Sequence, residues 1–436
     1  MNFDNEFTHQ PNGKALLPLG LFFVLYLITY LFTGDIAKMP VSVAFLFTSA
    51  VAVLFSKGGK ISARIELFCR GAANQTLLFM VVIFILAGAF AGSAKATGAV
   101  DATVNVMLYL MPGKIILAGI FIAACFISMS MGTSCGTIAA LAPIAAGISA
   151  QTGVGLPCML GIVVGGAMFG DNLSFISDTT IVATRTQECR MKDKFNTNIR
   201  LVLPAAILVS GIYVFLGFEL SYTAAHVPEG VEWLKVLPYL TVLIAALAGV
   251  NVVTVLFTGI ILSGIIGLLC GGFTAWNWAE ALGKGVVSDM GELIIVSLMA
   301  GGMFEIIRFN GGISWIINKL TKNIHSVRKA EFAIAALVSF TDFCTANNTI
   351  ALIITGPLAK KIGDNFSLDK RRVASILDTF SCFVQGIIPY GAQLLIAAGL
   401  SNSNPVEIIP FLYYPFLMGI FAMAGIIFRF PKARVE

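Results

Sequence analysis

Charged residues and long polar stretches are what this chain has least of. Asp, Glu, Lys and Arg make up 12% of its 436 residues, whereas hydrophobic residues make up 57%. No polar stretch is long enough to form a soluble domain, and apolar runs of about 17 residues or more recur along the chain. This composition excludes a soluble globular protein and predicts a chain that crosses a lipid bilayer many times.

Several motifs that would indicate catalysis or ATP-driven pumping are also missing. The chain has no GxxxxGK pattern, so we do not expect an ATP-driven pump. The eight cysteines form no CxxC pair and lie mostly in apolar runs, where a free cysteine usually acts as a small apolar side chain. The three histidines, His9, His226 and His325, all fall in predicted loops. We therefore expect no enzymatic activity, no metal cluster, no bound cofactor and no nucleic-acid partner.

Long hydrophobic runs predict an all-α polytopic membrane protein. Asp4 and Glu6 precede the first run and no small-residue cleavage site follows it, so we expect a retained helix rather than a signal peptide. The predicted spans of the first half are 15–32, 40–56, 76–94, 115–131 with a return at 137–149, 158–175 and 201–219. Those of the second half are 236–250, 252–270, 291–307, 331–343 with a return at 347–359, 373–396 and 411–429.

The two halves of the chain resemble each other. The segment Leu86–Phe90, followed by a glycine, matches Met299–Met303, which is also followed by a glycine. At nearly the same shift in residue number, 131–137 with a proline beyond it falls on 343–349 with a proline beyond it. A repeat that takes up half the chain is too long for a solenoid and is typical of the two halves of a transporter.

The distribution of Lys and Arg indicates that the two repeats, 1–219 and 235–436, are inverted. Basic residues crowd the loops after the second span and after the interrupted span of the first half, whereas the equivalent loops of the second half hold only Lys284. The intervening loops show the opposite bias. Since cytoplasmic loops are enriched in Lys and Arg, each half would have five crossings plus a re-entrant helical hairpin, 115–149 or 331–359, with both termini cytoplasmic. The basic residues assigned to the loop after the first interrupted span are Arg185, Arg190, Lys192, Lys194 and Arg200.

The stretch 128–180 gives the clearest functional signal. It is apolar enough for a bilayer, but glycines and a proline interrupt it, and its only acids are Asp171 and Asp178. Irregular backbone at membrane depth occurs only where protein or a watery cavity surrounds it, and an intramembrane acid is by default a candidate functional residue. The sequence therefore predicts broken helices at the midplane and a pathway for a small ion or solute.

Candidate ion ligands come from both halves and offer the carboxylate, hydroxyl and amide oxygens that hard cations prefer. The first-half candidates are Thr133, Ser134, Thr137, Asp171, Asn172, Ser174, Ser177, Asp178 and Thr179, with Asp171, Asp178 and Ser174 as the main Na+ ligands. The second-half candidates are Asp342, Asn347, Asn348, Thr349 and Asp378. For the hydroxyl residues the alternative is that they only let helices pack closely, and for Asp178 it is an ion pair with Arg185. A carboxylate in an apolar site can hold either a proton or a cation, which is sufficient for an antiporter.

Two segments, MGTSCGTIAALAPIA and GGAMFGDNLSFISDTT, resemble signature segments of the NhaC-type sodium/proton antiporters, and the similarity extends over most of the chain. One departure is Phe175, which stands where the family usually has proline. The resemblance implies a bacterial cytoplasmic-membrane antiporter of the ion-transporter superfamily, with inverted repeats, hairpins and an elevator-like transport domain on a dimeric scaffold. It also implies that the cation site contains Asp171, Ser174, Asp178 and Thr179, faced by Thr133 and Ser134.

Three functions remain open. The first is a sodium/proton antiporter whose intramembrane carboxylates bind Na+ and H+ in competition. The second is an ion-coupled carrier or exchanger of a small organic acid or amino acid, because relatives exchange such acids and 347–349 resembles the hairpin tips of sodium-coupled carboxylate carriers. The absence of an evident intramembrane arginine for a carboxylate substrate favours inorganic cations. The third is a channel, against which the inverted repeat argues. The expected partners are Na+, H+, the lipid bilayer and a second copy of the chain.

Overall fold

The chain is almost entirely helical. A computed structural model describes residues 10–33, 38–57, 59–110, 113–175, 177–218, 232–321 and 324–431. Within these ranges every regular element is a helix and none is a strand. Eight of the described helices are long and apolar enough to cross a membrane, or up to nine if a bent pair counts as one span. The prediction of an all-α polytopic membrane protein is confirmed.

The described elements follow one another in two similar series. The first series is α1 (Leu17–Thr33), α2 (Val41–Phe55), α3 (Ile61–Ala72), α4 (Gln75–Thr97), α5 (Ala99–Leu110), α6 (Gly113–Met131), α7 (Ser134–Thr152), α8 (Leu156–Leu173), α9 (Asp178–Thr186) and α10 (Met191–Phe218). The second is α11 (Trp233–Leu247), α12 (Val252–Leu269), α13 (Ala275–Lys284), α14 (Gly291–Phe309), α15 (Gly312–Thr321), α16 (Val327–Thr345), α17 (Asn348–Asn365), α18 (Lys370–Gln385), α19 (Ala392–Ser401), α20 (Pro405–Ile408) and α21 (Tyr413–Phe428).

The register between the two series is constant around the middle of each half. Helices α6 to α9 begin at residues 113, 134, 156 and 178, and α16 to α19 begin at 327, 348, 370 and 392, so that the shift in residue number is the same for all four pairs. The packing is repeated as well, with the two halves exchanged. Helix α3 contacts α14, and its counterpart α13 contacts α4, which is the counterpart of α14. In the same way α7 contacts α19, and their counterparts α17 and α9 contact each other. This shift is slightly larger than the sequence match indicated. The repeat boundaries 1–219 and 235–436, and the opposite membrane orientation of the halves, stay predictions.

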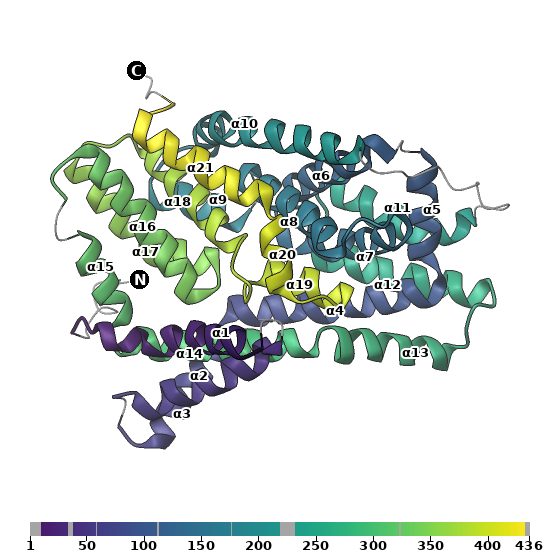
Figure 1. Ribbon diagram of the computed structural model, residues 1–436, viewed down its shortest axis with the longest axis horizontal. Helices are drawn as coiled ribbons and strands as arrows, with labels where there is room; N and C mark the ends of the chain where they lie inside the picture. Colours follow the sequence, from purple (N-terminus) through teal and green to yellow (C-terminus); the bar gives the residue numbers. More distant parts are fainter. Residues whose placement is uncertain are drawn as a thin grey trace.

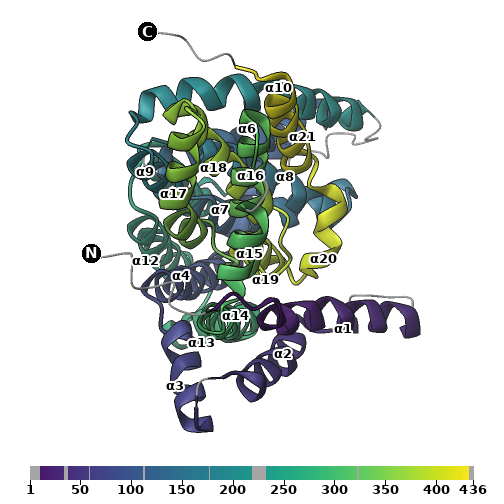
Figure 2. The ribbon, with the colours of Figure 1, turned by 90° about the vertical axis from the view of Figure 1, so that its left-hand side faces the viewer.

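Short helices lie where the sequence analysis expected loops, namely α3, α5, α13 and α15, and also the nine-residue α9 and the four-residue α20. Helices α3 and α5 have 12 residues each, and α13 and α15 have 10 each. A helix needs about 20 residues to cross a hydrocarbon core of roughly 30 Å, so a search for long apolar runs cannot find elements of this size. In Figure 2, α1, α2, α3, α13 and α14 lie on one side of the molecule, and α6 to α10 lie with α16 to α21 on the other.

Both predicted interruptions are present in the centre of the molecule (Figure 1). Helix α8 ends at Leu173 and α9 begins at Asp178, while α18 ends at Gln385 and α19 begins at Ala392. The returns predicted at 137–149 and 347–359 fall on the helices α7 and α17, each entered through a tight turn, and their re-entrant character stays a prediction. Gly132 and Ala346 occupy equivalent places in these turns and both have left-handed backbone, with φ of 68° and 50°.

Glycines bring α8 close to α6 just before the first interruption. A Cβ atom on Gly166 would lie 2.5 Å from the carbonyl oxygen of Phe121, and one on Gly170 would lie 2.5 Å from that of Cys125. Any larger side chain would therefore push the helices apart. The close approach places Asp171, the residue after Gly170, beside the turn between α6 and α7.

Candidate ion-binding site

A cavity of about 300 Å³ lies where the interrupted helices meet the N-termini of α7 and α17. Residues from both halves form its wall, including two carboxylates and several hydroxyl and amide side chains. The predicted ion ligands on this wall are Thr133, Ser134, Asp171, Ser177, Asp178, Thr179, Asn347, Asn348 and Thr349. Positions from opposite halves of the sequence are thus brought to one polar space that a small ion or solute could occupy.

Asp171 is the buried carboxylate of this cavity, with 5% of its surface exposed. The Ser134 hydroxyl donates to its Oδ2 at 2.9 Å, and the Ser177 hydroxyl donates to its Oδ1 at 2.5 Å. No lysine, arginine or histidine in the described part of the chain makes an ion pair with it. Hydroxyl groups therefore hold the carboxylate without neutralising it, so its charge is available to a cation or a proton.

A chain of hydrogen bonds connects Asp171 to the second half. The Gln393 amide donates to the Ser134 hydroxyl at 2.9 Å, and the Gln385 amide donates to the Gln393 carbonyl at 2.7 Å and to the Ala346 carbonyl at 3.2 Å. Ser134 in turn donates to Asp171. Since the donors of Gln385, Gln393 and Ser134 follow one another towards Asp171, the network orients the Ser134 hydroxyl and stabilises negative charge on the acid.

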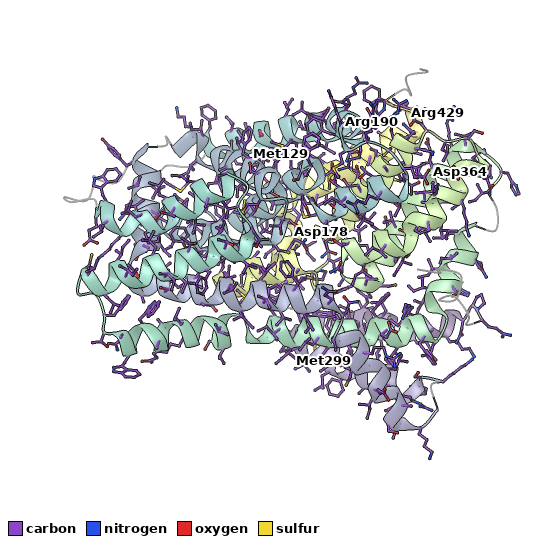
Figure 3. The ribbon with its side chains drawn as sticks, turned by 180° about the vertical axis from the view of Figure 1, so that it is seen from behind. Met129, Asp178, Arg190, Met299, Asp364 and Arg429 are labelled. Atoms are coloured by element: carbon purple, nitrogen blue, oxygen red, sulfur yellow. The ribbon has the colours of Figure 1, made fainter. Side chains whose placement is uncertain are left out.

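Asp178 is exposed to the cavity at the first residue of α9. It lies near the middle of the molecule, whereas Arg190, Asp364 and Arg429 lie towards one edge (Figure 3). No ion pair joins Asp178 to Arg185 in the residues that the structure describes. The alternative of a plain Asp178–Arg185 pair is therefore not what the structure contains, and the two first-half acids share the cavity.

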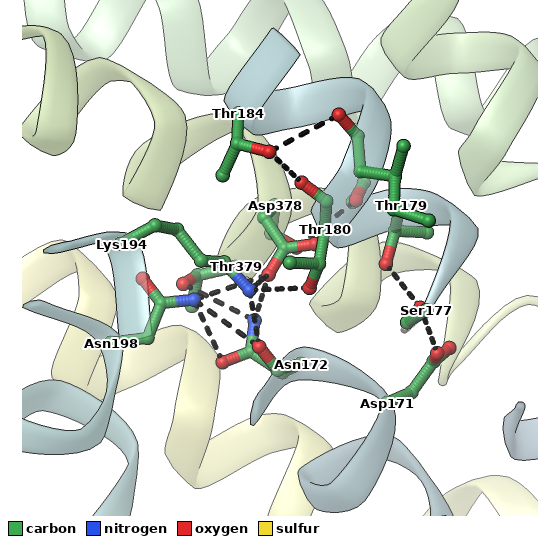
Figure 4. Close-up of polar contacts among 12 residues, drawn as sticks. Asp171, Asn172, Ser177, Thr179, Thr180, Thr184, Lys194, Asn198, Asp378 and Thr379 are labelled. Carbon is green, nitrogen blue, oxygen red and sulfur yellow. Dashed lines mark hydrogen bonds and ion pairs between the residues drawn. The ribbon is translucent and has the colours of Figure 1, made fainter. Parts of the chain in front are cut away.

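Asp378 belongs to a second polar cluster, apart from the Asp171 chain (Figure 4). It is completely buried, and the Lys194 ammonium forms an ion pair with its Oδ2 at 2.5 Å. The side-chain amides of Asn172 and Asn198 donate to the same oxygen at 2.9 and 3.1 Å. Lys194 also donates to the Thr180 hydroxyl at 2.8 Å. This acid is already neutralised by a lysine.

The assignment of the basic residues after the first interrupted span to one loop is largely wrong, because Arg185 lies in α9, and Lys192, Lys194 and Arg200 lie in α10. Of the four, only Lys194 is buried. Helix α10 begins at Met191, well before the predicted span at 201–219, and the Lys194 side chain is 1% exposed. Basic residues were counted as loop residues because the span was taken to begin where the apolar run begins. The helical period could have identified Lys194, because it precedes Asn198, Val202 and Ala205 at spacings of three or four residues on the buried face.

Several other predicted residues lie off the cavity wall. Asn172 belongs to the Asp378 cluster, Ser174 donates to the Met129 carbonyl at 2.8 Å, and Thr137 donates to the Thr133 carbonyl at 3.0 Å. Asp342 is buried apart from the cavity. The structure therefore brings Asp171 and Asp178 together but turns the Ser174 hydroxyl towards α6, and ion binding by any of these residues stays a prediction. The residues missed in the sequence were Lys194, Asn198 and Gln393.

A third group of charges lies at the surface between the halves. Glu188, in the turn between α9 and α10, accepts hydrogen bonds from Lys360 of α17 and from Lys370 of α18, the latter at 3.1 Å. Hydrogen bonding to these two ammonium groups holds the pKa of the Glu188 carboxyl below its usual value. These two ion pairs link the two halves of the chain, and none of their three residues lines the cavity.

Comparison with known proteins gives related antiporters. The sequence profile of the Na+/H+ antiporter family matches residues 14–218 and 231–431. The Na+/H+ antiporter NhaC of Bacillus subtilis is 26% identical over 81% of this chain and 84% of its own. The malate-2H+/Na+-lactate antiporter of the same species is 22% identical over 93% of this chain and 92% of its own. The arginine/ornithine antiporter ArcD of Halobacterium salinarum is 22% identical over 97% and 94%. These relatives exchange different solutes.

Proposed function

The chain belongs to the Na+/H+ antiporter family, and from this membership we propose that it exchanges Na+ for H+ across a bacterial membrane with Asp171 at its ion site. The observation that carries the proposal is that Asp171 is buried beside the cavity without a positively charged partner in the part of the chain that the structure describes. It is buried on the wall of a polar cavity, held by two hydroxyl donors, and has no basic partner in the described residues. A negative charge in such a position needs either a cation or a proton.

Competition between the two ions would occur at this one carboxylate. Na+ would be bound by oxygens of Asp171 and Asp178, with the hydroxyls of Ser177 and Thr179 close by. A proton on Asp171 would remove the charge that attracts the cation, so the two occupants exclude each other. Alternating exposure of the cavity to the two sides of the membrane would then couple their movements in opposite directions.

The Lys194–Asp378 pair supports this division of roles. The Lys194 ammonium lies 2.5 Å from Asp378 Oδ2 and balances its negative charge, so Asp378 does not require a transported cation for that purpose. Asn172 donates to Asp378 and is the next residue after Asp171. We therefore assign Lys194 and Asp378 to positioning the end of α8, and Asp171 to binding the ion.

A second candidate function is exchange of a small organic acid or amino acid, and the size of the cavity favours it. A water molecule takes up about 30 Å³ of liquid, so 300 Å³ could hold about ten waters or a small organic molecule. Two helix N-termini and several side-chain amides on the wall could bind a carboxylate. The malate/lactate and arginine/ornithine antiporters among the relatives agree with this alternative.

We also propose that the chain lies in the bacterial inner membrane as a multi-pass homodimer with both termini in the cytoplasm. The support for this orientation is the distribution of Lys and Arg among the loops. The proposal includes no enzymatic reaction.

The test is a flux assay in liposomes that contain a pH-sensitive dye. With a proton gradient imposed, adding Na+ outside should dissipate the gradient for the wild type and not for Asp171→Asn. The control is Asp101→Asn, because Asp101 is an exposed acid on α5 that does not line the cavity. Equal flux by Asp171→Asn and the wild type would show that the site is wrong. No response of the wild type to Na+ would reject Na+/H+ exchange, and malate, lactate and arginine would then be added as substrates.

A further inference from the structure

Asp342 is a buried acid that the proposed exchange does not use. It lies near the end of α16 and has no exposed surface. Neither of its carboxylate oxygens has a hydrogen-bond partner among the described residues, and the same is true of the neighbouring Thr341 hydroxyl. The backbone amide of Gln385 faces the carboxyl without reaching hydrogen-bond geometry. Because an ionised carboxylate without donors or a counter-charge is very costly to bury, the surroundings favour the uncharged acid, with a proton on one oxygen.

In the part of the chain that the structure describes, no neighbouring group supplies a positive charge to Asp342. The described titratable groups that interact electrostatically with Asp342 include Cys344 on the same helix and Tyr390 between α18 and α19. The Tyr390 hydroxyl donates to the Phe343 carbonyl at 2.6 Å. Charged side chains on α16 and on the helices packed against it are either paired or exposed. The pairs are Glu305–Arg308, Glu331–Arg372, Asp369–Arg371, Lys194–Asp378 and Glu188 with Lys360 and Lys370, and the exposed residues are Glu292, Lys319, Arg328, Lys329, Lys361 and Asp364.

A proton fits this position better than a sodium ion does. Asp342 does not line the 300 Å³ cavity. A sodium ion needs space and several oxygen ligands around it, whereas a proton needs only one carboxylate oxygen. The acid at Asp342 is therefore suited to bind H+ without competing Na+, unlike Asp171 on the cavity wall.

The first half shows that packing alone does not require an acid here. At the constant shift between the two series, the position equivalent to Asp342 is Ser128 on α6, whose hydroxyl donates to the Ala167 carbonyl of α8 at 2.6 Å. A small, fully bonded side chain is sufficient where α6 meets α8. A carboxyl without partners at the equivalent place between α16 and α18 has a cost to stability that only a functional role would offset.

The segment that carries Asp342 is also bonded into the network of the ion site. The Ala346 amide donates to the Asp342 carbonyl at 2.7 Å, and the Ala346 carbonyl accepts from Gln385. Gln385 leads through Gln393 to Ser134 and thus towards Asp171. Movement of this turn when Asp342 gains or loses a proton would reach the groups that hold the sodium ligand.

From these observations we propose that Asp342 is a second proton-binding carboxyl, separate from the Na+ site, so that more than one H+ moves for each Na+. The proposal rests on the proposed Na+/H+ exchange and adds its proton-to-sodium ratio. In each cycle one proton binds to a carboxylate oxygen of Asp342 on one side of the membrane and leaves from it on the other.

The experiment measures this ratio in liposomes from the Na+ gradient that exactly balances a set pH gradient at clamped voltage. The wild type should give more than one H+ per Na+, and Asp342→Asn should give one H+ fewer, with its half-saturating Na+ concentration changed less than about twofold. An unchanged ratio would overturn the proposal. A large loss of Na+ affinity would also overturn it, because it would make Asp342 a cation ligand. Failure of the proposed function would be visible in the wild type itself, as no Na+-driven proton flux.

Two variants and one spectrum separate a proton site from a structural role. Asp342→Glu keeps a titratable group and should keep the wild-type ratio. Thr341→Val is buried equally but removes no acid, and it should also keep the ratio. If Asp342→Asn does not fold, infrared spectroscopy of the wild type gives the answer. A neutral carboxyl band must persist at saturating Na+ in acid and disappear as the pH is raised, because a transported proton has to leave the carboxyl. A band that stays at every pH would make Asp342 a structural acid and overturn the proposal. Absence of that band in acid would overturn the proposal even without a transport measurement.

Discussion

Equivalent positions in the two halves have different chemistry, although the same series of helices repeats. At the constant shift between the series, Asp171 of α8 corresponds to Gln385 of α18, and Asp342 of α16 corresponds to Ser128 of α6. Asp378 corresponds in the same way to Val164. Each of these acids therefore has an uncharged counterpart. The helices of the two halves are thus arranged alike, but the side chains at equivalent positions differ. Those side chains decide where each half carries an acid.

Asp171 and Asp378 also differ in how their surroundings balance them. Asp171 has hydroxyl donors and a cavity beside it, whereas Asp378 has a lysine and no place on the cavity wall. An acid that is balanced by a lysine is part of the structure, and an acid that is held only by hydroxyls can still accept a mobile ion. The predictions below test this difference.

The largest effect is expected from Lys194→Met, which leaves Asp378 buried without a counter-charge. Breaking one partner of a buried ion pair destabilises a protein by about 3–5 kcal/mol, and replacing both partners is much less costly. Lys194→Met should therefore strongly lower the apparent melting temperature in detergent micelles, and Lys194→Met with Asp378→Asn should recover most of the loss. A single variant as stable as the wild type would contradict the role of this pair.

The next effect concerns the hydroxyls around Asp171. Ser177→Ala removes the donor that lies 2.5 Å from Oδ1. A hydrogen bond to a charged group contributes about 1.5–3 kcal/mol, and its loss favours the protonated, uncharged form of Asp171. At a fixed pH Na+ should therefore compete with the proton roughly 10- to 100-fold less well. The measurement is the Na+ concentration that gives half-maximal proton flux. Ser210→Ala on α10, where the hydroxyl donates to the Ala206 carbonyl, is the control and should leave this value unchanged.

A smaller effect is expected when the connection between the halves is cut. Gln393→Leu removes the amide that joins Gln385 to Ser134, while Ser134 keeps its bond to Asp171. Because these bonds join neutral groups, each contributes about 0.5–1.5 kcal/mol, and the Na+ affinity should fall roughly three- to tenfold. A loss greater than that of Ser177→Ala would mean that the network, rather than the hydroxyls on Asp171, controls binding.

The smallest effect is expected at the surface, where Glu188→Gln breaks the links to Lys360 and Lys370. Since the folded-state pKa of Glu188 is lowered, its contribution to stability is present above the unfolded pKa of about 4.3 and is lost as the pH falls through the folded value. Melting temperatures of the variant and the wild type should differ slightly at neutral pH and converge in acid. A difference that grows in acid would have the wrong sign.

Much of the fold could be predicted from local features of the sequence. Apolar length predicted the long helices, and the glycines before Asp171 predicted the first interruption, because both depend on residues close together in the chain. Helices α3, α5, α13 and α15 were missed because their 10 to 12 residues are too few to span a bilayer. Lys194 was missed because charge was taken to mark the end of a span.

The sequence by itself determined that this is a helical membrane protein, that its helices break near Asp171 and Gln385, and that intramembrane acids are its candidate functional groups. These properties follow from hydrophobicity and backbone preferences over short stretches. The tertiary structure alone decided which acids are balanced. Lys194 reaches Asp378 from the other half, Gln393 reaches Ser134 in the same way, and Asp342 meets no hydrogen-bond partner among the described residues. Ion pairs and hydrogen bonds between buried side chains depend on which distant residues folding brings together. A pattern of neighbouring residues in the sequence therefore cannot predict them.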